Sequence, residues 1–392
     1  MSGALTLKEL SASTVAHDRD VLVGLSHRIH GKPELGFEEE SASAWCAEQL
    51  ADAGFSVETG VCDLPTAFAA TAGSGPFVLA ICAEYDALPG IGHACGHNVI
   101  ASAAIGAGRA LAPIADDLGI TIKVLGTPAE EGGGGKILMM ERGGFDGLNA
   151  AMMVHPAPGE LDRMPCLAVE HFDVVYRGKE AHASAFPERG VNAADALTVA
   201  QVAIGLLRQH AGFGDQVHGI VTLGGAAPNI VPAHTEAKYY VRARTVKALE
   251  EWSPRVRRCF EAGAVATGSS VEIVPKGPTY SEFHTDEAMT ALYQANAEAL
   301  GRVFPPVGER TMSGSTDMAN VSLSIPSIHP MLGLDSFPAV NHQPEFTAAA
   351  GSPIADQAVL DGAMAMAWTV IDLAGSSQER KRLTEKAYRH DG

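Results

Sequence analysis

One short stretch of the chain, residues 84–98, is rich in side chains that can bind a metal ion. It contains two carboxylates, two histidines and a cysteine, set in a glycine-rich turn between an apolar run and a helical run. Thiolate, imidazole and carboxylate groups are the ligands that a borderline-soft metal such as zinc takes in proteins. The stretch therefore predicts a metal centre, and together with the residues below it predicts the chemistry of a metallohydrolase.

A second acidic motif, Glu130-Glu131, follows the next predicted strand along the chain. One of two adjacent carboxylates can bind metal while its neighbour faces the substrate as a general base for a metal-bound water. The alternative interpretation is a solvated acidic turn. Pro128 before the pair and four consecutive glycines after it favour close approach of the backbone to a site.

Cys95 and His97 are two residues apart, so both could reach one metal site from a single tight turn. A buried structural cysteine beside a helix-capping histidine would produce the same spacing. A structural zinc site of the finger type is disfavoured, because a second Cys/His pair at a suitable distance is missing from the sequence. His93 could be a further ligand or could only orient the turn.

The elements that must position these residues alternate between strand and helix. Glu84 and Asp86 follow one predicted strand, Glu130 and Glu131 the next, and His155 a third. This order is typical of an α/β sheet with parallel strands, whose sites lie at the carboxyl ends of the strands. The periodicity predicts helices at 18–30, 38–54 and 98–112, and strands at 68–71, 77–83, 119–126 and 150–154.

The pattern changes after about residue 168. Strands at 168–177, 219–224, 237–245 and 270–275, with helices at 193–210 and 249–266, give the β-α-β-β-α-β order of a ferredoxin-like unit. Alanine-rich helices and short apolar strands resume from residue 285. We therefore expect a discontinuous α/β catalytic domain, 1–168 and 279–392, interrupted by an inserted ferredoxin-like α+β domain, 169–278.

Composition sets limits on the partners. The formal net charge is −18, with 46% hydrophobic and 19% charged residues. Nucleic acids and anionic membranes attract basic patches, so we expect neither as a partner. The six cysteines are scattered, and we see neither a signal-peptide pattern nor an apolar run of ~18 residues. A cytoplasmic protein with free thiols is the simplest expectation.

Several motifs follow one another in the order in which they occur in a known family. Together they resemble the M20 metallopeptidases, in particular the amidohydrolase and aminoacylase branch, which includes hydrolases of auxin conjugates, N-acyl amino acids and aminobenzoyl-glutamate. The motifs are LSHRIHGKPELGFEE at 25–39, EYDALP at 84–89, HACGHN at 93–98, PAEEG at 128–132 and NHQPEF at 341–346. The resemblance implies a mixed-sheet, zinc-peptidase-like catalytic domain with an inserted lid and dimerisation domain.

The resemblance also implies roles for the residues of the site. Cys95 would bridge two divalent metal ions, zinc or manganese with cobalt as a further candidate. Glu130 would be the general base, which deprotonates the bridging water and later protonates the leaving amine. The other implied ligands are His97, Glu131, His155 and His342, and the residues implied to support the ligands from behind are Glu84, Asp86 and His93.

In the inserted domain, the resemblance implies that His182 reaches the active site of a partner subunit and stabilises the oxyanion. Asn229 and Arg242 would bind substrate, since an arginine can hold a carboxylate bidentately. The alternatives are a helix-capping histidine, a turn asparagine and a surface arginine.

A glycine- and serine-rich loop with Gly314 and Ser315 is similar to the family loop that lines the carboxylate pocket. It continues with Thr-Asp-Met at 316–318, where much of the branch has Glu-Asp-Phe. This departure leaves the identity of the bound substrate open.

These expectations describe a homodimeric, dinuclear metal amidohydrolase. It would cleave the amide bond of an N-acyl amino acid or small dipeptide with a metal-bridging hydroxide. Two alternatives remain: a hydrolase of a non-peptide C–N bond, of the deaminase or carbamoyl-amide type, and a catalytically silent binding protein.

Overall fold

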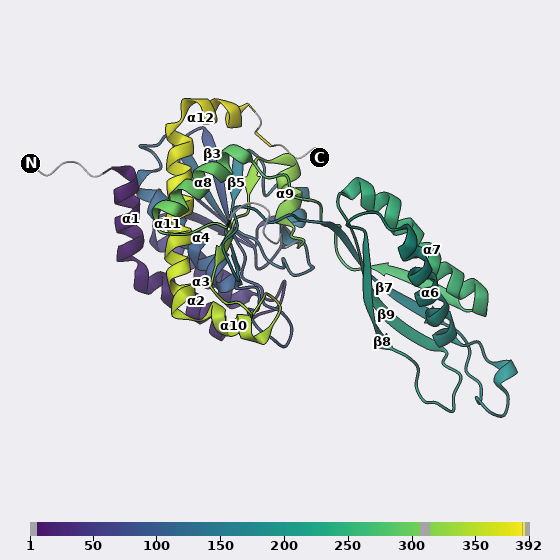
Figure 1. Cartoon of the computed structure of the whole chain (residues 1–392). Coiled ribbons are helices and arrows are strands. Elements are labelled where there is room, and N and C mark those ends of the chain that lie inside the picture. Colours follow the sequence, from purple (N-terminus) through teal and green to yellow (C-terminus); the bar gives the residue numbers. More distant parts are fainter. Residues whose placement is uncertain (1–5, 306–313, 386, 389–392) are drawn as a thin grey trace, which may run out of the picture. The chain divides into compact units, whose positions relative to one another are not determined.

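The computed structural model describes residues 6–305, 314–385 and 387–388, which belong to two compact units (Figure 1). Unit 1 consists of Met1–Pro165 and Phe283–Gly392, and unit 2 of Cys166–Glu282. Our expected boundaries, 168/169 and 278/279, fall slightly inside unit 2. Two backbone hydrogen bonds between Val169 and Tyr280, 2.9 and 3.0 Å long, explain the difference at the second boundary. They join the segment that follows strand 270–275 to strand 168–177, so that segment belongs to unit 2.

Unit 1 is built on a six-stranded sheet in the order β1-β2-β4-β3-β5-β11. The pairs β1–β2 and β2–β4 are antiparallel, whereas β4–β3, β3–β5 and β5–β11 are parallel. The expected α/β fold with a mixed sheet is thereby confirmed. The strands are β1 (Ser56–Thr59), β2 (Phe68–Gly73), β3 (Phe77–Ala83), β4 (Ile120–Gly126), β5 (Ala150–Met152) and β11 (Ser327–Ile328).

Residues 150–154, which we expected to form one strand, divide between two sheets. β5 ends at Met152, and β6 (His155–Ala157) pairs in parallel with β12 (Met331–Gly333) in a separate two-stranded sheet. The sequence predicts an apolar run here but does not predict which later segment each half pairs with.

Helices cover both faces of the six-stranded sheet, and β3 shows why. Its Leu79 and Ile81 belong to a large hydrophobic cluster on the side of α4 and α11, and Ala80 and Cys82 to a smaller one on the side of α5 and α9. The helices of unit 1 are α1 (Leu7–His17), α2 (Arg19–Gly31), α3 (Glu40–Asp52), α4 (His97–Leu111), α5 (Gly135–Glu141), α8 (Glu287–Ala299), α9 (Met318–Ser324), α10 (Pro344–Ala350), α11 (Pro353–Gly375) and α12 (Ser377–Thr384), with short 3-10 turns at Val61–Asp63 and Ala112–Ile114.

The small side chains of α4 let it pack closely on its neighbours. A Cβ at Gly108 would lie 2.6 Å from Val124 of β4, and one at Gly106 would lie 2.8 Å from Ala363 of α11. Close contact between α4, the sheet and α11 therefore depends on these glycines. Within the described residues, α11 is the one helix long and apolar enough to span a membrane, and 72% of the relevant window is buried inside the structure.

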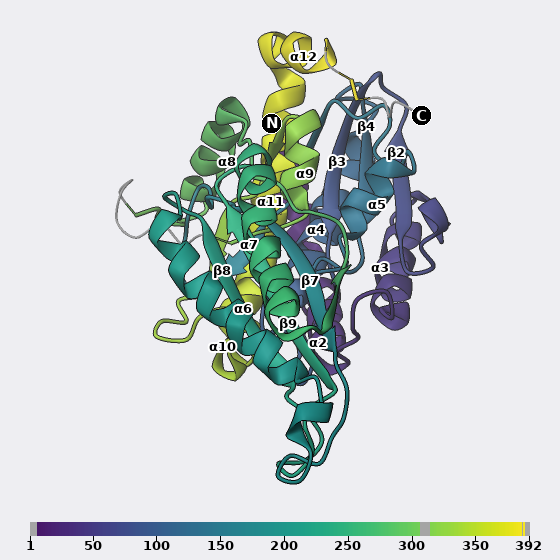
Figure 2. The ribbon, with the colours of Figure 1, turned by 90° about the vertical axis from the view of Figure 1, so that its right-hand side faces the viewer.

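Unit 2 has a four-stranded antiparallel sheet in the order β10-β7-β9-β8. With its two helices this gives the expected β-α-β-β-α-β order of a ferredoxin-like unit (Figures 1 and 2). α6 and α7 pack side by side on one face of the sheet. The elements are β7 (Ala168–Arg177), α6 (Ala193–Leu207), β8 (Gln216–Leu223), β9 (His234–Ala243), α7 (Val246–Thr267) and β10 (Ser270–Pro275), with 3-10 turns at Pro187–Arg189 and Arg208–His210.

Candidate metal centre

The fold of unit 1 brings the predicted ligands together from distant parts of the chain. Three groups of side chains each have ligand atoms within 4.8 Å of one another. All five predicted metal ligands fall in the first two groups, and Cys95 belongs to both. The groups are Cys95, His97 and His155; Cys95, Glu131 and His342; and Glu84, His97 and Glu130.

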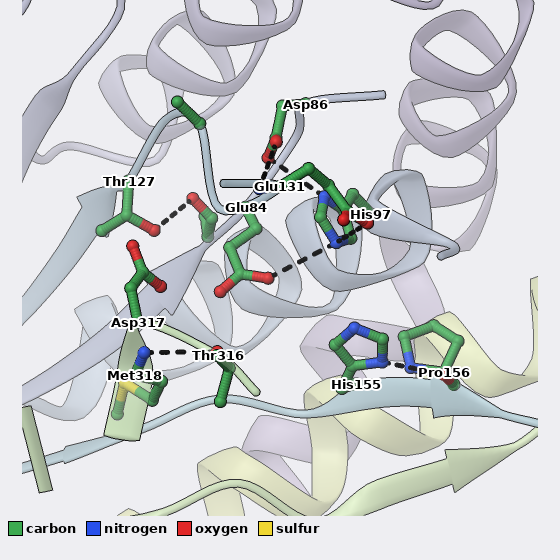
Figure 3. A network of polar contacts seen from close by, with 12 residues as sticks. Glu84, Asp86, His97, Thr127, Glu131, His155, Pro156, Thr316, Asp317 and Met318 are labelled. Carbon is green, nitrogen blue, oxygen red and sulfur yellow. Dashed lines mark hydrogen bonds and ion pairs between the residues drawn. The ribbon is translucent and has the colours of Figure 1, made fainter. Parts of the chain in front are cut away.

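Asp86 holds two of these residues in place from behind. Its Oδ1 accepts a hydrogen bond from Nδ1 of His97 at 3.1 Å, and its Oδ2 accepts one from the backbone N–H of Glu131 at 2.9 Å (Figure 3). Because Nδ1 of His97 is the donor, its Nε2 is left to face the cluster. A carboxylate behind an imidazole is the usual way to fix the tautomer of a metal-binding histidine.

A backbone carbonyl fixes the tautomer of His155 in a similar way. Its Nδ1 donates to the carbonyl oxygen of Pro156 at 2.8 Å, which leaves Nε2 as the lone-pair nitrogen. Burial, followed by the charge of His97, lowers the pKa of His155 to about 3. The imidazole is therefore neutral at pH 7, the form in which histidine binds metal.

His93 does not join any of the three groups. Its Nε2 donates to the carbonyl oxygen of Ile29 at 3.1 Å, and its ring stacks against His30. The side chain is buried and connects the turn before α4 to α2. This position fits the expectation that His93 orients the turn.

Glycines allow two loops to reach the site. Gly96 has φ +75° at the start of α4, and a Cβ there would lie 2.9 Å from Pro156. A Cβ at Gly135 would lie 1.8 Å from the carbonyl oxygen of Pro128, so the glycine run brings the loop after β4 against the start of α5. Larger residues at either position would push the ligand-bearing loops apart.

Two non-glycine residues near the site have a left-handed backbone, Ala129 (φ +57°) in the loop after β4 and His342 (φ +68°) just before α10. Neighbouring hydrogen bonds hold both in place. The N–H of Ala129 donates to Oε1 of Glu39 at 2.8 Å, and the N–H of His342 donates to the carbonyl oxygen of Ala94 at 2.9 Å. The second bond ties the C-terminal segment directly to the turn that carries Cys95.

The electrostatics of the cluster favour a cation. Burial alone would lower the pKa of His97, but Asp86 and Glu84 raise it to about 10. Burial, with Glu131 as the next cause, raises the pKa of the Cys95 thiol well above its usual range. Burial raises the pKa of Glu130 well above its usual range, and the charges of Glu84 and Glu131 raise it further. The pocket thus carries an excess of acceptor groups that protons or a metal ion can satisfy.

Unpartnered atoms point to the same conclusion. Within the described residues, Glu84 Oε2, His97 Nε2 and Glu131 Oε1 are buried without a hydrogen-bond partner. Glu84 Oε2 lies 3.7 Å and Glu131 Oε1 lies 3.9 Å from His97 Nε2. Buried polar atoms are rarely left unsatisfied. A thiol, imidazoles and carboxylates in this arrangement fit one or two divalent metal ions, and Glu84 offers an additional donor.

Lys136 belongs to the site but was not found from the sequence. Its side chain is fully buried, and its Nζ contacts Glu84 Oε1 and lies 2.8 Å from Asp317 Oδ1. Its backbone N–H also donates to Asp317 Oδ2 at 2.9 Å. Burial alone lowers the pKa of Lys136, but Asp317 and Glu84 raise it above the usual value. The one available signal was its place at the start of the apolar run 137–140.

His329 was missed as well. It is buried, its ring centroid lies 5.4 Å from that of His155, and within the described residues neither ring nitrogen has a partner. Burial and then His155 lower its pKa to about 3. The signal that could have found it is a repeated pattern, because the His-Pro of 155–156 recurs at 329–330, close to the start of each strand of the β6–β12 pair.

The loop with Gly314 and Ser315 leads into the buried Thr316 and Asp317. The N–H of Gly314 donates to the carbonyl oxygen of Pro165 at 3.3 Å, and Asp317 holds Lys136. The structure therefore places the Thr-Asp part of this loop beside Glu84, with the partly buried Gly314 and Ser315 just before it.

The three predicted residues of unit 2 fall in two places. His182 is exposed and its Nδ1 accepts from the N–H of Ser184 and of Ala185, while the carbonyl oxygen of Asn229 accepts from Ala183. His182 and Asn229 thus lie on adjoining loops. Arg242 lies on β9, where its Nε donates to Nε2 of His218 at 3.2 Å. Their roles in the reaction stay predictions.

Comparisons with known proteins identify the family. Residues 80–359 match the model of peptidase family M20/M25/M40. The chain is 38% identical over 390 residues to the Xaa-Arg dipeptidase of Mus musculus, covering 94% of this chain and 89% of the relative. It is 34% identical over 218 residues to the N-acetyl-L-cysteine deacetylase of Bacillus subtilis, covering 47% of this chain and 50% of the relative.

Solved structures share the fold. The aminobenzoyl-glutamate utilization protein of Klebsiella pneumoniae has a TM-score of 0.68 at 19% identity, covering 88% of this chain and 96% of its own. The YXEP protein of Bacillus subtilis, a dinuclear metal-binding peptidase of family M20, has a TM-score of 0.63 at 21% identity, covering 91% and 99%.

The buried ion cluster gives a first prediction, for Lys136→Met. This change leaves Glu84 and Asp317 without their cation, and breaking a buried pair in this way costs about 3–5 kcal/mol. We expect the free energy of unfolding of the metal-free protein at pH 7, measured by urea denaturation, to fall by that amount. Lys32→Met is the matched control, since Lys32 pairs with Glu34 at 3.2 Å with a half-exposed side chain and should cost less than about 1 kcal/mol. Equal losses in the two variants would contradict the assigned role of Lys136.

Proposed function

This chain belongs to peptidase family M20/M25/M40, and from that premise we propose that it is a metal-dependent hydrolase of the amide bond in a small dipeptide or an N-acyl amino acid. The observation that carries the proposal is the donor set around Cys95, in which Cys95, His97 and His155 are buried, Glu131 is partly buried and His342 is exposed, together with the buried Glu130. The 38% identity to an Xaa-Arg dipeptidase supports dipeptides with a C-terminal arginine as the first substrates to test.

Two donor groups would hold two divalent ions, zinc or manganese. Cys95, His97 and His155 would hold one, and Cys95, Glu131 and His342 the other. When bound, such ions polarise the amide carbonyl and lower the pKa of water at the site. Soft and borderline ligands in the first group favour zinc, whereas manganese also accepts the imidazole and carboxylate donors.

The residues of the chain supply the proton transfers and the orientation. Glu130 takes the proton of the attacking water and delivers it to the leaving amine. Asp86 keeps Nε2 of His97 directed into the site and holds the backbone of Glu131. In unit 2, His182 would stabilise the developing oxyanion and Arg242 would bind the substrate carboxylate, with Asn229 on the loop beside His182.

The general-base assignment can be tested with Glu130→Gln. The amide retains the shape of the side chain but cannot accept the proton of water, so we expect kcat to fall by roughly 10²–10⁴. The assay is release of free arginine from Xaa-Arg dipeptides, and of amino acids from N-acyl derivatives, by the metal-loaded protein. Metal content, measured by elemental analysis, should stay near that of the wild type. Glu141→Gln, at the exposed end of α5, should behave as the wild type. Retained turnover in Glu130→Gln would remove this role.

Metal binding should release protons and strengthen as pH rises. Cys95 and His97 have pKa values above their usual range in the metal-free site, and both must lose a proton to bind metal. Calorimetry of zinc binding in buffers of different ionisation enthalpy measures the protons released. Cys95→Ser should release fewer and bind at least about tenfold more weakly. Cys62→Ser, at a partly exposed position of unit 1, is the control. Unchanged proton release in Cys95→Ser would argue against ligation.

The proposed enzyme is a homodimer that associates through unit 2. β8 is the edge strand of its sheet and carries the exposed apolar residues Ile220 and Val221. The neighbouring helix α6 adds Val202 and Leu206. An edge strand with exposed apolar side chains offers a surface on which a second copy can pair.

The dimer prediction rests on Leu206, whose exposed fraction is 71%. Leu206→Glu should convert the dimer to a monomer, because a buried charge at the interface costs several kcal/mol. Sedimentation velocity measures the mass, and circular dichroism checks the fold. Val265→Glu, on the exposed side of α7, should leave the mass unchanged. A monomeric wild type, or a Leu206→Glu variant that stays dimeric, would count against this interface.

A further inference from the structure

A row of aromatic and imidazole side chains crosses the face of the unit 2 sheet that lies opposite α6 and α7. In the strand register, Tyr240 of β9 stands directly between His171 of β7 and His218 of β8. The rings of His171 and Tyr240 are stacked with centroids 3.9 Å apart, and those of His218 and Tyr240 lie 5.7 Å apart. The row therefore forms a packed support on this face.

Arg242 lies on the same face, two residues along β9 from Tyr240. Its Nε donates to Nε2 of His218 at 3.2 Å, and its guanidinium carbon lies 5.9 Å from the centre of the Tyr240 ring. Because Nε2 of His218 accepts this bond, the ring proton of His218 sits on Nδ1. One edge of the guanidinium plane is thus fixed by a side chain of the neighbouring strand.

We propose that His218 is a positioning residue that sets the orientation of the Arg242 guanidinium for bidentate binding of the substrate's carboxylate. This inference rests on the carboxylate-binding role of Arg242 in the proposed function. Binding through the two terminal Nη atoms of Arg242 leaves the Nε bond to His218 intact, so orientation and substrate binding are compatible.

The chemistry of the partner supports this role. An aspartate or glutamate in place of His218 would orient Arg242 but would also neutralise the charge that attracts a carboxylate. A neutral imidazole orients the guanidinium without adding a negative charge of its own. Burial and the nearby Arg242 lower the pKa of His218, so the imidazole is the neutral acceptor at pH 7. Burial, and then Arg242, likewise lowers the pKa of His171 to about 4.

The test compares His218→Ala and His218→Gln on a matched pair of substrates, a dipeptide with a free C-terminal carboxylate and the same dipeptide as its C-terminal amide. In His218→Ala we expect KM for the acid to rise about tenfold, the size of a lost hydrogen bond to a charged group, with kcat little changed. KM for the amide should stay as in the wild type. His218→Gln should restore KM for the acid, because its side-chain oxygen can accept from Nε of Arg242.

His234→Ala is the matched control, since His234 lies on the same face of β9 and pairs with Glu236 at 3.0 Å. It should match the wild type on both substrates. Equal effects of His218→Ala on acid and amide, or none on either, would overturn the inference. So would a glutamine variant as impaired as the alanine variant.

A readout that does not need turnover separates this inference from the proposed function. In the full chain labelled with ¹⁵N-histidine, NMR should show His218 with its proton on Nδ1, and Arg242→Ala should raise the pKa of His218. A proton on Nε2 in the wild type overturns the orienting bond. A wild type that cleaves acid and amide equally well, or neither, while His218 keeps its proton on Nδ1 refutes the carboxylate role of Arg242 in the proposed function, and the orienting bond stands.

Discussion

Compensation of buried negative charge is the constraint on which the rest of the site depends. Glu84, Asp86, Glu130 and Asp317 are all buried within one cluster. An uncompensated buried carboxylate costs several kcal/mol, so a fold that gathers several of them must also supply cations. Lys136 serves Glu84 and Asp317, and His97 serves Asp86. Glu130 and Glu131 add further carboxylates to the same cluster, with Glu131 near both His97 and His342, and a divalent cation can compensate this concentration of negative charge.

The order of the sheet explains why this charge gathers at one place. β3 and β4 are parallel neighbours, so Glu84 and Glu130, which follow their carboxyl ends, emerge at the same edge. His155 arrives because the chain leaves β5 and enters β6 of a second sheet. His342, the ligand nearest the C-terminus, is held at the site by the hydrogen bond from its backbone N–H to the carbonyl oxygen of Ala94. The course of the backbone thus determines where each ligand lies. Gly96 and Gly135 contribute because a side chain at either position would clash with the neighbouring loop.

Sequence reasoning succeeded where the signal is local. The alternation of strands and helices predicted the four-stranded sheet of unit 2 and strands β2, β3, β4 and β5 of the six-stranded sheet. The types and spacing of Cys95, His97 and Glu130-Glu131 predicted a cluster that the structure assembles. It failed where burial depends on partners far along the chain. A lysine in the first turn of a helix is ordinarily exposed. Lys136 is buried because it pairs with Asp317, which lies 181 residues further along the chain and could not be connected to it from the sequence. The break between β5 and β6 likewise depends on β11 and β12, which come much later in the sequence.

The two units use orienting partners of different charge, and the difference follows from the ligand each side chain would meet. In unit 1, the anionic Asp86 stands behind His97, which increases the basicity of the imidazole toward a cation. In unit 2, the neutral His218 accepts a hydrogen bond from Arg242, which adds no negative charge beside the guanidinium that we propose to bind a carboxylate. Exchanging the two partners would weaken both sites, because a neutral group behind His97 would reduce its donor strength and a carboxylate behind Arg242 would compete with the substrate. The charges of Asp86 and His218 therefore match the ligands proposed for the two side chains that they orient, a cation at His97 and an anion at Arg242.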